Sequence, residues 1–350
     1  MTKNLLLTVS QLGQGNNASS KPRDDIEYFL KEEGFETKDL KIDINSKFQK
    51  ALYRYWKLDH EFKPYLAQLQ PKNVFIQYPA YSKVIMDKIL DIIHTTVPTA
   101  AITFIIHDVE SLRMHKGQDD FKKQEVHMFN HVSNLIVHNK AMKEWLKDNG
   151  VQTHMELLQL FDYKSDIKPS KKPILDNSIC FAGNLKKSQF INKLDNNKDN
   201  NIKFYVFGNG LNVTGLKNVI YKGSKKPDEL PKFLTYSYGL IWDGDAVNTC
   251  AGEYGEYLKY NSPHKASLYL SAGLPIIVWS QSALAPFVKE HATGLVVDSL
   301  EDLNKEFLNT SKRQYLAMKT NAIKIGEQLQ EGHFIKTATK KTQLNRGYFK

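Results

Sequence analysis

The sequence predicts an α/β protein built from two doubly wound domains, and three observations point to this fold. Short apolar runs alternate with amphipathic stretches, which is the pattern of βα units around a mainly parallel sheet. The pattern occurs twice, on either side of a segment at 162–177 that is rich in Lys and Pro and holds few large apolar residues. The 350 residues are also about the length of two domains. We therefore expect two Rossmann-like domains joined by a linker.

In the first half, buried strands are expected where runs rich in Val, Ile, Leu or Phe end at a polar or Pro boundary, at 5–10, 73–77, 102–107 and 134–137. Amphipathic helices fill the intervals, at 24–31, 81–93, 119–129 and 141–149. Gly150 follows the last of them in the position of a C′ cap.

In the second half, strands are expected at 179–182, 204–207, 239–242, 276–279 and 295–297. Helices are expected at 227–235, 263–271 and 285–290, and the pattern from about residue 300 onward is mostly helical. The predicted domains are 1–165 and 166–330, followed by a helical tail at 331–350 that packs back on the first domain.

Composition narrows the classes of function. The chain has 48 basic and 38 acidic residues, a net charge of +10 that favours anionic partners. Cys180 and Cys250 form no Cys-x-x-Cys pair, so neither a disulfide scaffold nor a zinc module is expected, and a reducing cytoplasm is the natural location. No run is long enough for a membrane span. The lysines are scattered without interleaved aromatic residues, so no nucleic-acid partner is expected.

The segment from Lys259 to Lys265 is the strongest candidate for binding a phosphate. Asn261 or Ser262 would cap a helix that has Pro263 in its first turn, followed by His264 and Lys265. The free N–H groups of such a helix start bind phosphate, and Lys265 adds a full charge. A well-capped surface helix is an equally good interpretation of these local features.

A second candidate opens the second domain. Gly183 directly follows a predicted strand and lets the chain approach a ligand closely, while Asn184 and Lys187 can donate to a diphosphate. A plain turn with solvated lysines is the more frequent case. The predicted donor site also includes Gly208, which follows the strand expected at 204–207, and Lys222 and Gly223, which come shortly after the apolar pair Val219 and Ile220. The glycines at 208 and 210 lack a third Gly and a following helix, so a dinucleotide fingerprint is not supported.

The polar loop at 11–21 follows the first predicted strand. Its backbone amides at 13–16 could contact a sugar, which makes Gln11 and Gly15 candidates for binding an acceptor and Asn16 a candidate for the donor. A loop with no such role is the alternative.

His107 and Asp108 follow the apolar run at 102–106, at the carboxyl end of a buried strand. A His beside an Asp there is a candidate general base, because a base must lie near the hydroxyl whose proton it takes. Arg113 is a candidate for binding the acceptor. The alternative is a buried capping Asp beside an incidental His.

No metal site is expected. Among His127, His131 and His138, only the first two have i,i+4 spacing, and no Glu lies between them as in a zinc protease motif. Asp243 and Asp245 could hold a metal, but helix N-termini and lysines can neutralise a diphosphate without one. We therefore place Asp243 among the donor-site residues and expect no cofactor.

Taken together, these segments resemble the glucosyltransferase family that acts second in the O-glycosylation of serine-rich-repeat adhesins in streptococci and lactobacilli. The resemblance is carried by the residues at 107–113, 182–185, 261–265 and 271–279. It implies the GT-B fold, in which two Rossmann-like domains face each other across a cleft. It also implies a UDP-glucose or UDP-GlcNAc donor, an acceptor GlcNAc already attached to adhesin Ser or Thr, and a cytoplasmic homotetramer.

One departure from the wider GT-B group bears on mechanism. Many retaining members carry Glu-x7-Glu before the Ala-x-Gly-x-Pro turn, and here Tyr260 and Leu268 stand at those positions. Direct displacement with a base in the first domain is therefore favoured. Two alternatives remain: a polysaccharide or galactofuranosyl-type transferase acting on a lipid-linked acceptor, and a non-catalytic GT-B partner of another transferase.

Overall fold

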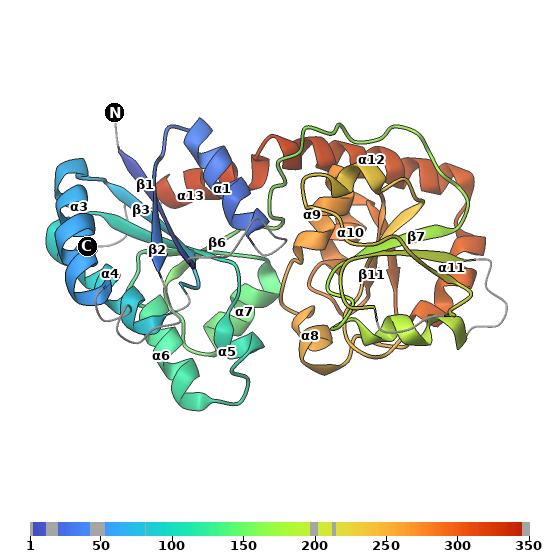
Figure 1. Cartoon of the computed structure of the whole chain (residues 1–350), viewed down its shortest axis with the longest axis horizontal. Coiled ribbons are helices and arrows are strands. Elements are labelled where there is room, and N and C mark those ends of the chain that lie inside the picture. The colour runs from blue at the N-terminus through green and yellow to red at the C-terminus, as the bar shows by residue number, and fades with distance from the viewer. Residues whose placement is uncertain are drawn as a thin grey trace. The chain divides into compact units, whose positions relative to one another are not determined.

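The chain forms two α/β units, each built on a six-stranded parallel sheet (Figure 1). The structure is a computed structural model that describes residues 3–11, 20–42, 53–80, 82–196, 202–211 and 215–344. Unit 1 consists of residues 1–138, 143–158 and 335–350, and unit 2 of residues 139–142 and 159–334. The predicted α/β class with two doubly wound sheets is confirmed.

The sheet of unit 1 has the strand order β2-β1-β3-β4-β5-β6. Its strands are β1 (Asn4–Gln11), β2 (Glu36–Ile42), β3 (Asn73–Tyr78), β4 (Ala101–Ile106), β5 (Asn134–Val137) and β6 (His154–Leu157). All neighbours run parallel, with Leu5 opposite Val74 and Val74 opposite Ile102. The chain order reverses between β1 and β3, so the carboxyl ends of these strands form the switch point at which such sheets bind ligands.

Helices cover this sheet because they present apolar residues at helical spacing. In α4 (Lys83–Thr96), for example, Ile85, Ile89 and Ile93 recur every four residues and are all buried. The other helical elements that lie wholly or mostly in unit 1 are α1 (Lys21–Glu32), η1 (Tyr53–Phe62), α3 (Lys63–Leu69), α5 (Glu110–Arg113), α6 (Asp119–Phe129), α7 (Lys140–Asp148) and α13 (His333–Leu344).

The last helix pairs with the first in unit 1. Lys336 of α13 lies 3.2 Å from Glu32, at the end of α1, and Lys340 lies 3.0 Å from Glu33. Unit 1 is therefore discontinuous in sequence and includes the C-terminal helix from residue 335.

The sheet of unit 2 has the strand order β12-β11-β10-β7-β8-β9 and is also parallel. Its strands are β7 (Ser178–Ala182), β8 (Lys203–Phe207), β9 (Val219–Tyr221), β10 (Tyr238–Ile241), β11 (Ile276–Trp279) and β12 (Gly294–Val297). Its switch point lies between β7 and β10, where the chain order reverses.

The longest helix of unit 2 is α12 (Lys312–Gln330), which begins with a capping box between Ser311 and Gln314. It packs closely on α9 (His264–Ser271), since a Cβ added to Gly326 would lie 2.2 Å from the carbonyl oxygen of Leu270. The remaining helical elements of this unit are η2 (Gln189–Asn196), η3 (Leu230–Phe233), α8 (Gly252–Tyr257), α10 (Ala285–His291), η4 (Leu300–Asp302) and α11 (Leu303–Asn309).

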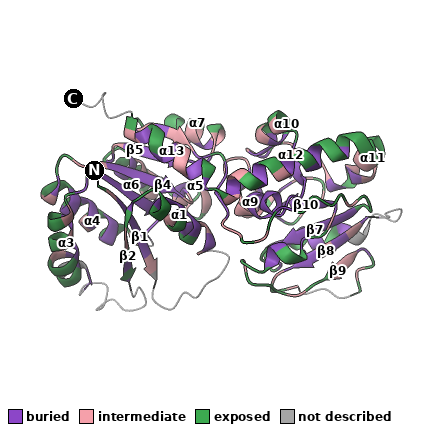
Figure 2. Cartoon of the chain, turned by 90° about the horizontal axis from the view of Figure 1, so that it is seen from above, coloured by how far each residue is buried: buried purple, intermediate pink, exposed green. Residues whose placement is uncertain are grey.

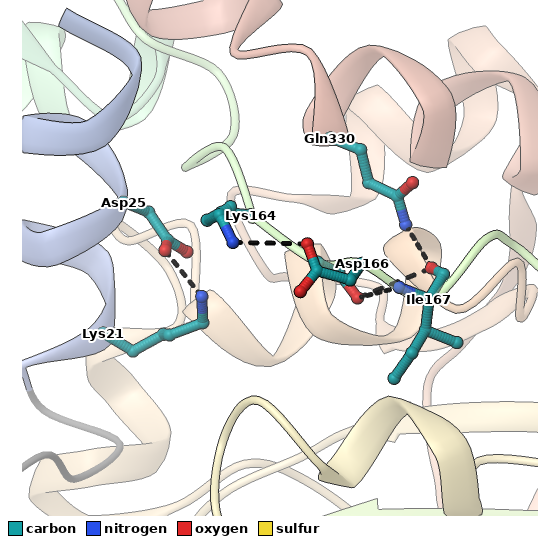
Figure 3. Close-up of polar contacts among 7 residues, drawn as sticks. Lys21, Asp25, Lys164, Asp166, Ile167 and Gln330 are labelled. Carbon is teal, nitrogen blue, oxygen red and sulfur yellow. Dashed lines mark hydrogen bonds and ion pairs between the residues drawn. The ribbon is translucent and has the colours of Figure 1, made fainter. Parts of the chain in front are cut away.

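The segment between β6 and β7 has no helix or strand, as expected for a linker. Polar contacts tie it down locally: Gln330 Nε2 donates to the carbonyl oxygens of Ile167 at 2.7 Å and Ser271 at 3.0 Å, and Lys164 lies 3.3 Å from Asp166 (contacts within the segment and to Gln330 are drawn in Figure 3). In the described ranges, no helix is long and apolar enough to cross a membrane.

The buried strands predicted from the apolar runs are all present, and in Figure 2 the central strands of both sheets are largely in the buried colour. One predicted helix is largely absent from the structure. The helix expected at 227–235 is only the short 3-10 turn η3 at Leu230–Phe233, because Pro227 and Pro231 remove two backbone donors within five residues. The helix expected to start at Pro263 begins at His264 instead.

Candidate functional site

The side chain of Lys265 lies close to residues that follow two strands of unit 2, β7 and β10. Lys265 Nζ lies 2.9 Å from Asp243 Oδ2, 3.3 Å from the carbonyl oxygen of Trp242 and 4.6 Å from the centre of the Phe181 ring. Its Cδ lies 3.9 Å from the position that a Cβ on Gly183 would occupy. The structure therefore brings Gly183, Asp243 and Lys265 together at the switch point between β7 and β10. The Lys265 and Asp243 side chains are partly exposed, at 18% and 22%.

Tyr269 fixes α9 over this point. Its buried hydroxyl accepts a hydrogen bond of 2.7 Å from the backbone N–H of Ala182, and burial holds the pKa of the phenol well above its usual value. A side chain at Gly239 would clash with the Tyr269 ring, with a Cβ only 2.3 Å from its Cγ. Tyr269 lies one helical turn after Lys265, so it also sets the position of the lysine. Neither Tyr269 nor Gly239 was predicted from the sequence, although a Gly inside an apolar strand is a signal of close packing.

Three predicted glycines form one rim at the carboxyl ends of β7, β8 and β9. The N–H of Gly183 donates to the carbonyl oxygen of Phe207 at 3.0 Å, and the N–H of Gly208 donates to the carbonyl oxygen of Gly223 at 3.1 Å. Gly208 has φ of +136°, and a Cβ there would lie 1.8 Å from the Gly183 carbonyl oxygen. Only Gly fits, and the rim presents backbone rather than side chains to a ligand.

The other lysines predicted for the donor site each lie over an aromatic ring: Lys187 over Tyr254 at 4.3 Å, Lys222 over Tyr205 at 5.4 Å and Lys259 over Trp279 at 5.5 Å. Asn184 Oδ1 accepts a hydrogen bond of 3.1 Å from the N–H of Lys186, so its side chain stabilises the turn after β7.

The start of α9 differs from the prediction. Pro263 is the N-cap residue, with ψ of 138°, and within the described chain no side chain caps this helix. Proline fixes φ but leaves ψ free, so it can stand just before a helix as well as in its first turn. Ser262 Oγ instead accepts a hydrogen bond of 3.1 Å from Asn139, which belongs to unit 2. The His264 ring stacks on Tyr163 at 5.1 Å.

Asn261 has a buried acceptor atom. Among the described residues, nothing donates a hydrogen bond to its Oδ1. A buried acceptor with no partner is costly, and a bound hydroxyl or N–H would satisfy it. This atom therefore suits a sugar or base group of a ligand better than a phosphate oxygen.

In unit 1, polar side chains gather at the switch point between β1 and β3. Gln77, fully buried on β3, donates from Nε2 to Thr8 Oγ1 at 2.9 Å and to the carbonyl oxygen of Arg23 at 3.2 Å. His107 Nε2 lies 2.8 Å from Gln77 Oε1. His107 was predicted from the sequence and Gln77 was not, although a polar residue inside an apolar strand is a signal of a specific contact.

His107 and Asp108 have different partners. Asp108 forms an ion pair with Arg113, while His107 is hydrogen-bonded to Gln77. Asp108 does not cap α5, because Val109 is the N-cap residue of that helix and the buried Glu125 accepts from the N–H groups of Glu110 at 2.9 Å and Ser111 at 3.0 Å. Burial and, after it, the Glu125 charge raise the pKa of Glu110. His107 and Asp108, the two candidates for the general base, thus lie on a loop whose following turn is anchored by Glu125.

Most of the predicted acceptor loop at 11–21 lies outside the described residues, including Gly15, Asn16 and the Gln11 side chain. Its last residue, Lys21, is described and is the first residue of α1 rather than part of a loop. Lys21 and Asp25, at the start of α1, form a buried ion pair of 2.6 Å (Figure 3).

Within the described ranges, no three His, Cys, Asp or Glu side chains come close enough to hold a metal ion. Asp243 is engaged with Lys265, and His131 Nδ1 lies 2.7 Å from the carbonyl oxygen of His127. Cys180 and Cys250 are buried free thiols.

Two doubly wound parallel sheets of this topology form the GT-B fold, and solved structures with this fold cover nearly the whole chain. Sucrose-phosphate synthase from Thermosynechococcus elongatus matches with a TM-score of 0.68 at 12% identity, over 98% of each chain. HepE from Anabaena, solved in complex with UDP, matches with a TM-score of 0.65 at 12% identity, over 98% of this chain and 100% of that one. At this identity the similarity concerns the fold.

Among proteins with this fold, the chain belongs to the Glucosyltransferase 3-like family: the N-terminal domain of the family matches residues 6–160 and its C-terminal domain residues 179–342. The β-1,6-galactofuranosyltransferase WbbI of Escherichia coli K12 is 30% identical over 239 residues, 66% of this chain and 68% of the relative. Glucosyltransferase 3 of Streptococcus gordonii is 29% identical over 237 residues, 67% and 68% of the two chains. The family resemblance predicted from the sequence is confirmed, and the chain is a glycosyltransferase.

Proposed function

We propose that this glycosyltransferase moves a hexose, glucose or N-acetylglucosamine, from a UDP-sugar onto an N-acetylglucosamine attached to Ser or Thr of a serine-rich-repeat adhesin. The switch point of unit 2 is the observation that carries the donor half of this proposal. The name of the streptococcal relative and the UDP complex of HepE support the same donor class. The acceptor half rests on the family resemblance.

The donor site suits a diphosphate linked to a sugar. The glycine rim offers backbone to the phosphates, and Lys265 has up to three N–H donors, of which Asp243 and the carbonyl oxygen of Trp242 take two. A diphosphate at this point competes with Asp243 for the ammonium group. The unsatisfied Asn261 Oδ1 would accept from a hydroxyl or N–H of the nucleoside.

The chemistry that we propose is direct displacement at the anomeric carbon. The acceptor oxygen forms the new C–O bond while the bond from the anomeric carbon to the phosphate oxygen breaks, and its electron pair leaves with UDP. His107 takes the acceptor proton. Asp108 is the weaker candidate, because taking a proton would require its carboxylate to give up the ion pair with Arg113. Lysines such as Lys265 stabilise the charge that develops on the leaving diphosphate.

A transfer assay with a matrix of donors and acceptors tests the proposal. UDP-glucose, UDP-GlcNAc and UDP-galactofuranose are each combined with a GlcNAc-bearing Ser/Thr peptide, the same peptide without GlcNAc, and an alkyl glycoside that mimics a lipid-linked acceptor. We expect a mass increase of one hexose or GlcNAc on the glycosylated peptide alone. Transfer to the alkyl glycoside but not to the peptide would overturn the acceptor assignment.

The E. coli relative favours one specific alternative. Its name identifies a galactofuranosyltransferase, so turnover of UDP-galactofuranose in the same matrix would support the second function, a polysaccharide-type transferase. UDP binding without turnover of any pair would instead point to a non-catalytic partner of another transferase. The family resemblance also leads us to expect a cytoplasmic protein that forms a homotetramer. Light scattering of the purified chain would test the oligomeric state.

A further inference from the structure

Gln77 is a fully buried amide in a strand whose neighbouring residues are apolar or aromatic. Burying an amide is costly unless its donors and acceptor are satisfied. Here both ends are engaged, with Nε2 facing Thr8 Oγ1 and the carbonyl oxygen of Arg23, and Oε1 facing His107. A satisfied buried network of this kind holds its members in one arrangement.

The network fixes which way the amide points. The carbonyl oxygen of Arg23 can only accept, so the Gln77 atom 3.2 Å from it must be the NH2 group. The Gln77 oxygen therefore faces His107 Nε2 at 2.8 Å. Since an amide oxygen can only accept, His107 Nε2 must carry the hydrogen in this contact.

We propose that Gln77 is a positioning residue that holds His107 in the tautomer with its proton on Nε2, so that Nδ1 is the atom that takes the proton of the acceptor hydroxyl. The assignment of the base atom rests on the proposed function, whereas the tautomer does not. A neutral imidazole has one N–H and one lone pair, so committing Nε2 to Gln77 leaves the lone pair on Nδ1.

The main chain of Gln77 is held as firmly as its side chain. The buried Arg23 donates from Nη1 to the carbonyl oxygen of Gln77 at 3.0 Å and from Nη2 to that of Pro79 at 2.7 Å. In return, Gln77 Nε2 donates to the carbonyl oxygen of Arg23. An apolar side chain such as Leu would fill the same space in β3 but would not orient the imidazole.

Among the described residues, charged and titratable groups lie on the elements that adjoin His107. They include Arg23 on α1, the Asp108–Arg113 pair on the same loop, Glu110 on α5, Glu125 on α6, and His138 after β5, which is hydrogen-bonded to the His107 backbone. A substitution at Gln77 leaves all of these groups in place. A change in the titration of His107 in such a variant therefore reports on residue 77.

The first experiment measures the tautomer and needs no transferase activity. The full chain is labelled with ¹⁵N-histidine, and the ring signals of His107 are identified by their loss in His107→Asn. We expect the Nε2–H form with an unprotonated Nδ1 above the pKa of the ring. The Nδ1–H form would overturn the proposal.

The second experiment compares two matched variants. Gln77→Glu places a carboxylate against His107 Nε2, which should raise the pKa of His107 by about one unit or more, because an opposite charge favours imidazolium. The acid limb of the pH profile of kcat should move to higher pH by the same amount. Asn73→Asp is the control, a buried amide at the other end of β3 that pairs with Asn4 Oδ1 at 2.7 Å, and it should move neither.

A purely structural role would predict the same result for both variants, with stability changed and the titration of His107 unmoved, and this would overturn the proposal. If Gln77→Glu does not fold, the tautomer of His107 measured in the parent chain still supports or overturns the proposal. If the tautomer and the titration shift are as expected but no sugar is transferred, the proposed function fails and the positioning role of Gln77 stands.

Discussion

Lys265 is the residue whose loss should weaken donor binding most, because its ammonium lies at the point where β7 and β10 diverge. A charge-assisted contact is worth about 1.5–3 kcal/mol, so Lys265→Ala should weaken UDP binding roughly ten- to a hundredfold. The variant also leaves Asp243 without its partner, which adds repulsion toward the diphosphate. Calorimetric titration with UDP measures the effect. Lys289→Ala, an exposed lysine on α10, is the control, and unchanged affinity in a folded Lys265→Ala protein would contradict this role.

The two adjacent titratable residues after β4 should differ in their effects on turnover. If His107 takes the acceptor proton, His107→Ala should lower kcat by about 10²–10⁴, with UDP affinity near normal because the donor site lies in unit 2. Asp108→Asn should cost less, because that carboxylate is engaged by Arg113. Steady-state kinetics separate the two. A larger loss in Asp108→Asn would identify Asp108 as the base, and parental rates in both would make the pair structural.

The carboxyl ends of β4 and β5 are joined by a buried histidine that should make unit 1 sensitive to acid. His138 Nε2 lies 3.1 Å from the carbonyl oxygen of Ile106, and burial lowers the pKa of His138 from 6.5 to about 4. Between these values the unfolded chain binds the proton and the folded chain does not, so stability falls as the pH drops from 6.5 toward 4. The loss attributable to this group reaches about 2–3 kcal/mol by pH 4.5.

The matched variant is His138→Gln, whose amide N–H can still donate to Ile106 but does not titrate. Hydrogen exchange of the β4 and β5 amides at pH 7 and pH 4.5 measures the stability of this region. We expect the parent chain to lose more protection on acidification than the variant. Equal losses in the two chains would show that His138 does not cause the acid sensitivity.

All central strands of both sheets could be predicted from the sequence, as could the edge strand β12, whereas the edge strands β2, β6 and β9 could not. β3 and β5 are buried at every position, so their sequences are continuous apolar or aromatic runs with few polar residues. β2 has only two buried residues, and β6 and β9 are short and half-exposed. The sequences of β2 and β6 are too polar for the apolar-run criterion, and the apolar run of β9 is only three residues long.

Site residues at the ends of strands and helices were predicted from the sequence, whereas site residues inside strands and helices were missed. Gly183, Gly208 and Lys265 follow strands or open a helix, so position alone identified them. Gln77 and Tyr269 lie within β3 and α9, and their roles depend on the partners His107 and Ala182, distant in sequence. The Lys265–Asp243 ion pair likewise joins two segments whose proximity is set by the packing of α9.

The path of the chain through the two units leads to a prediction about its C-terminus. Residues 335–344 follow α12 of unit 2 but belong to unit 1, where Lys336 and Lys340 pair with Glu32 and Glu33. Ile335 and Ala338 of this helix are buried. A chain truncated after Gly332 should therefore lose hydrogen-exchange protection in α1 and β1 while UDP affinity is largely retained. Loss of protection confined to unit 2 would contradict this assignment.

For the whole enzyme, we predict that activity does not depend on a divalent metal. The charge of a bound diphosphate must be neutralised, and Lys265 is already at the switch point to do so. Asp243, one of the two carboxylates that could hold a metal there, is engaged by that lysine, so a cation would have to displace the ammonium. A metal would also need further ligands, and in the described parts of the chain no third His, Cys, Asp or Glu completes such a group.

The measurement is transfer to the glycosylated peptide after dialysis against EDTA, with and without added Mg²⁺ or Mn²⁺. We expect the same rate in all samples, within about twofold, because on the order of 1 kcal/mol of transition-state stabilisation already changes a rate about fivefold. Lys265→Ala assayed in parallel separates two explanations of any metal effect. Complete inhibition of the parent by EDTA that Mg²⁺ reverses would show that Asp243 and Asp245 hold a metal and that Lys265 only occupies its place in the unliganded chain.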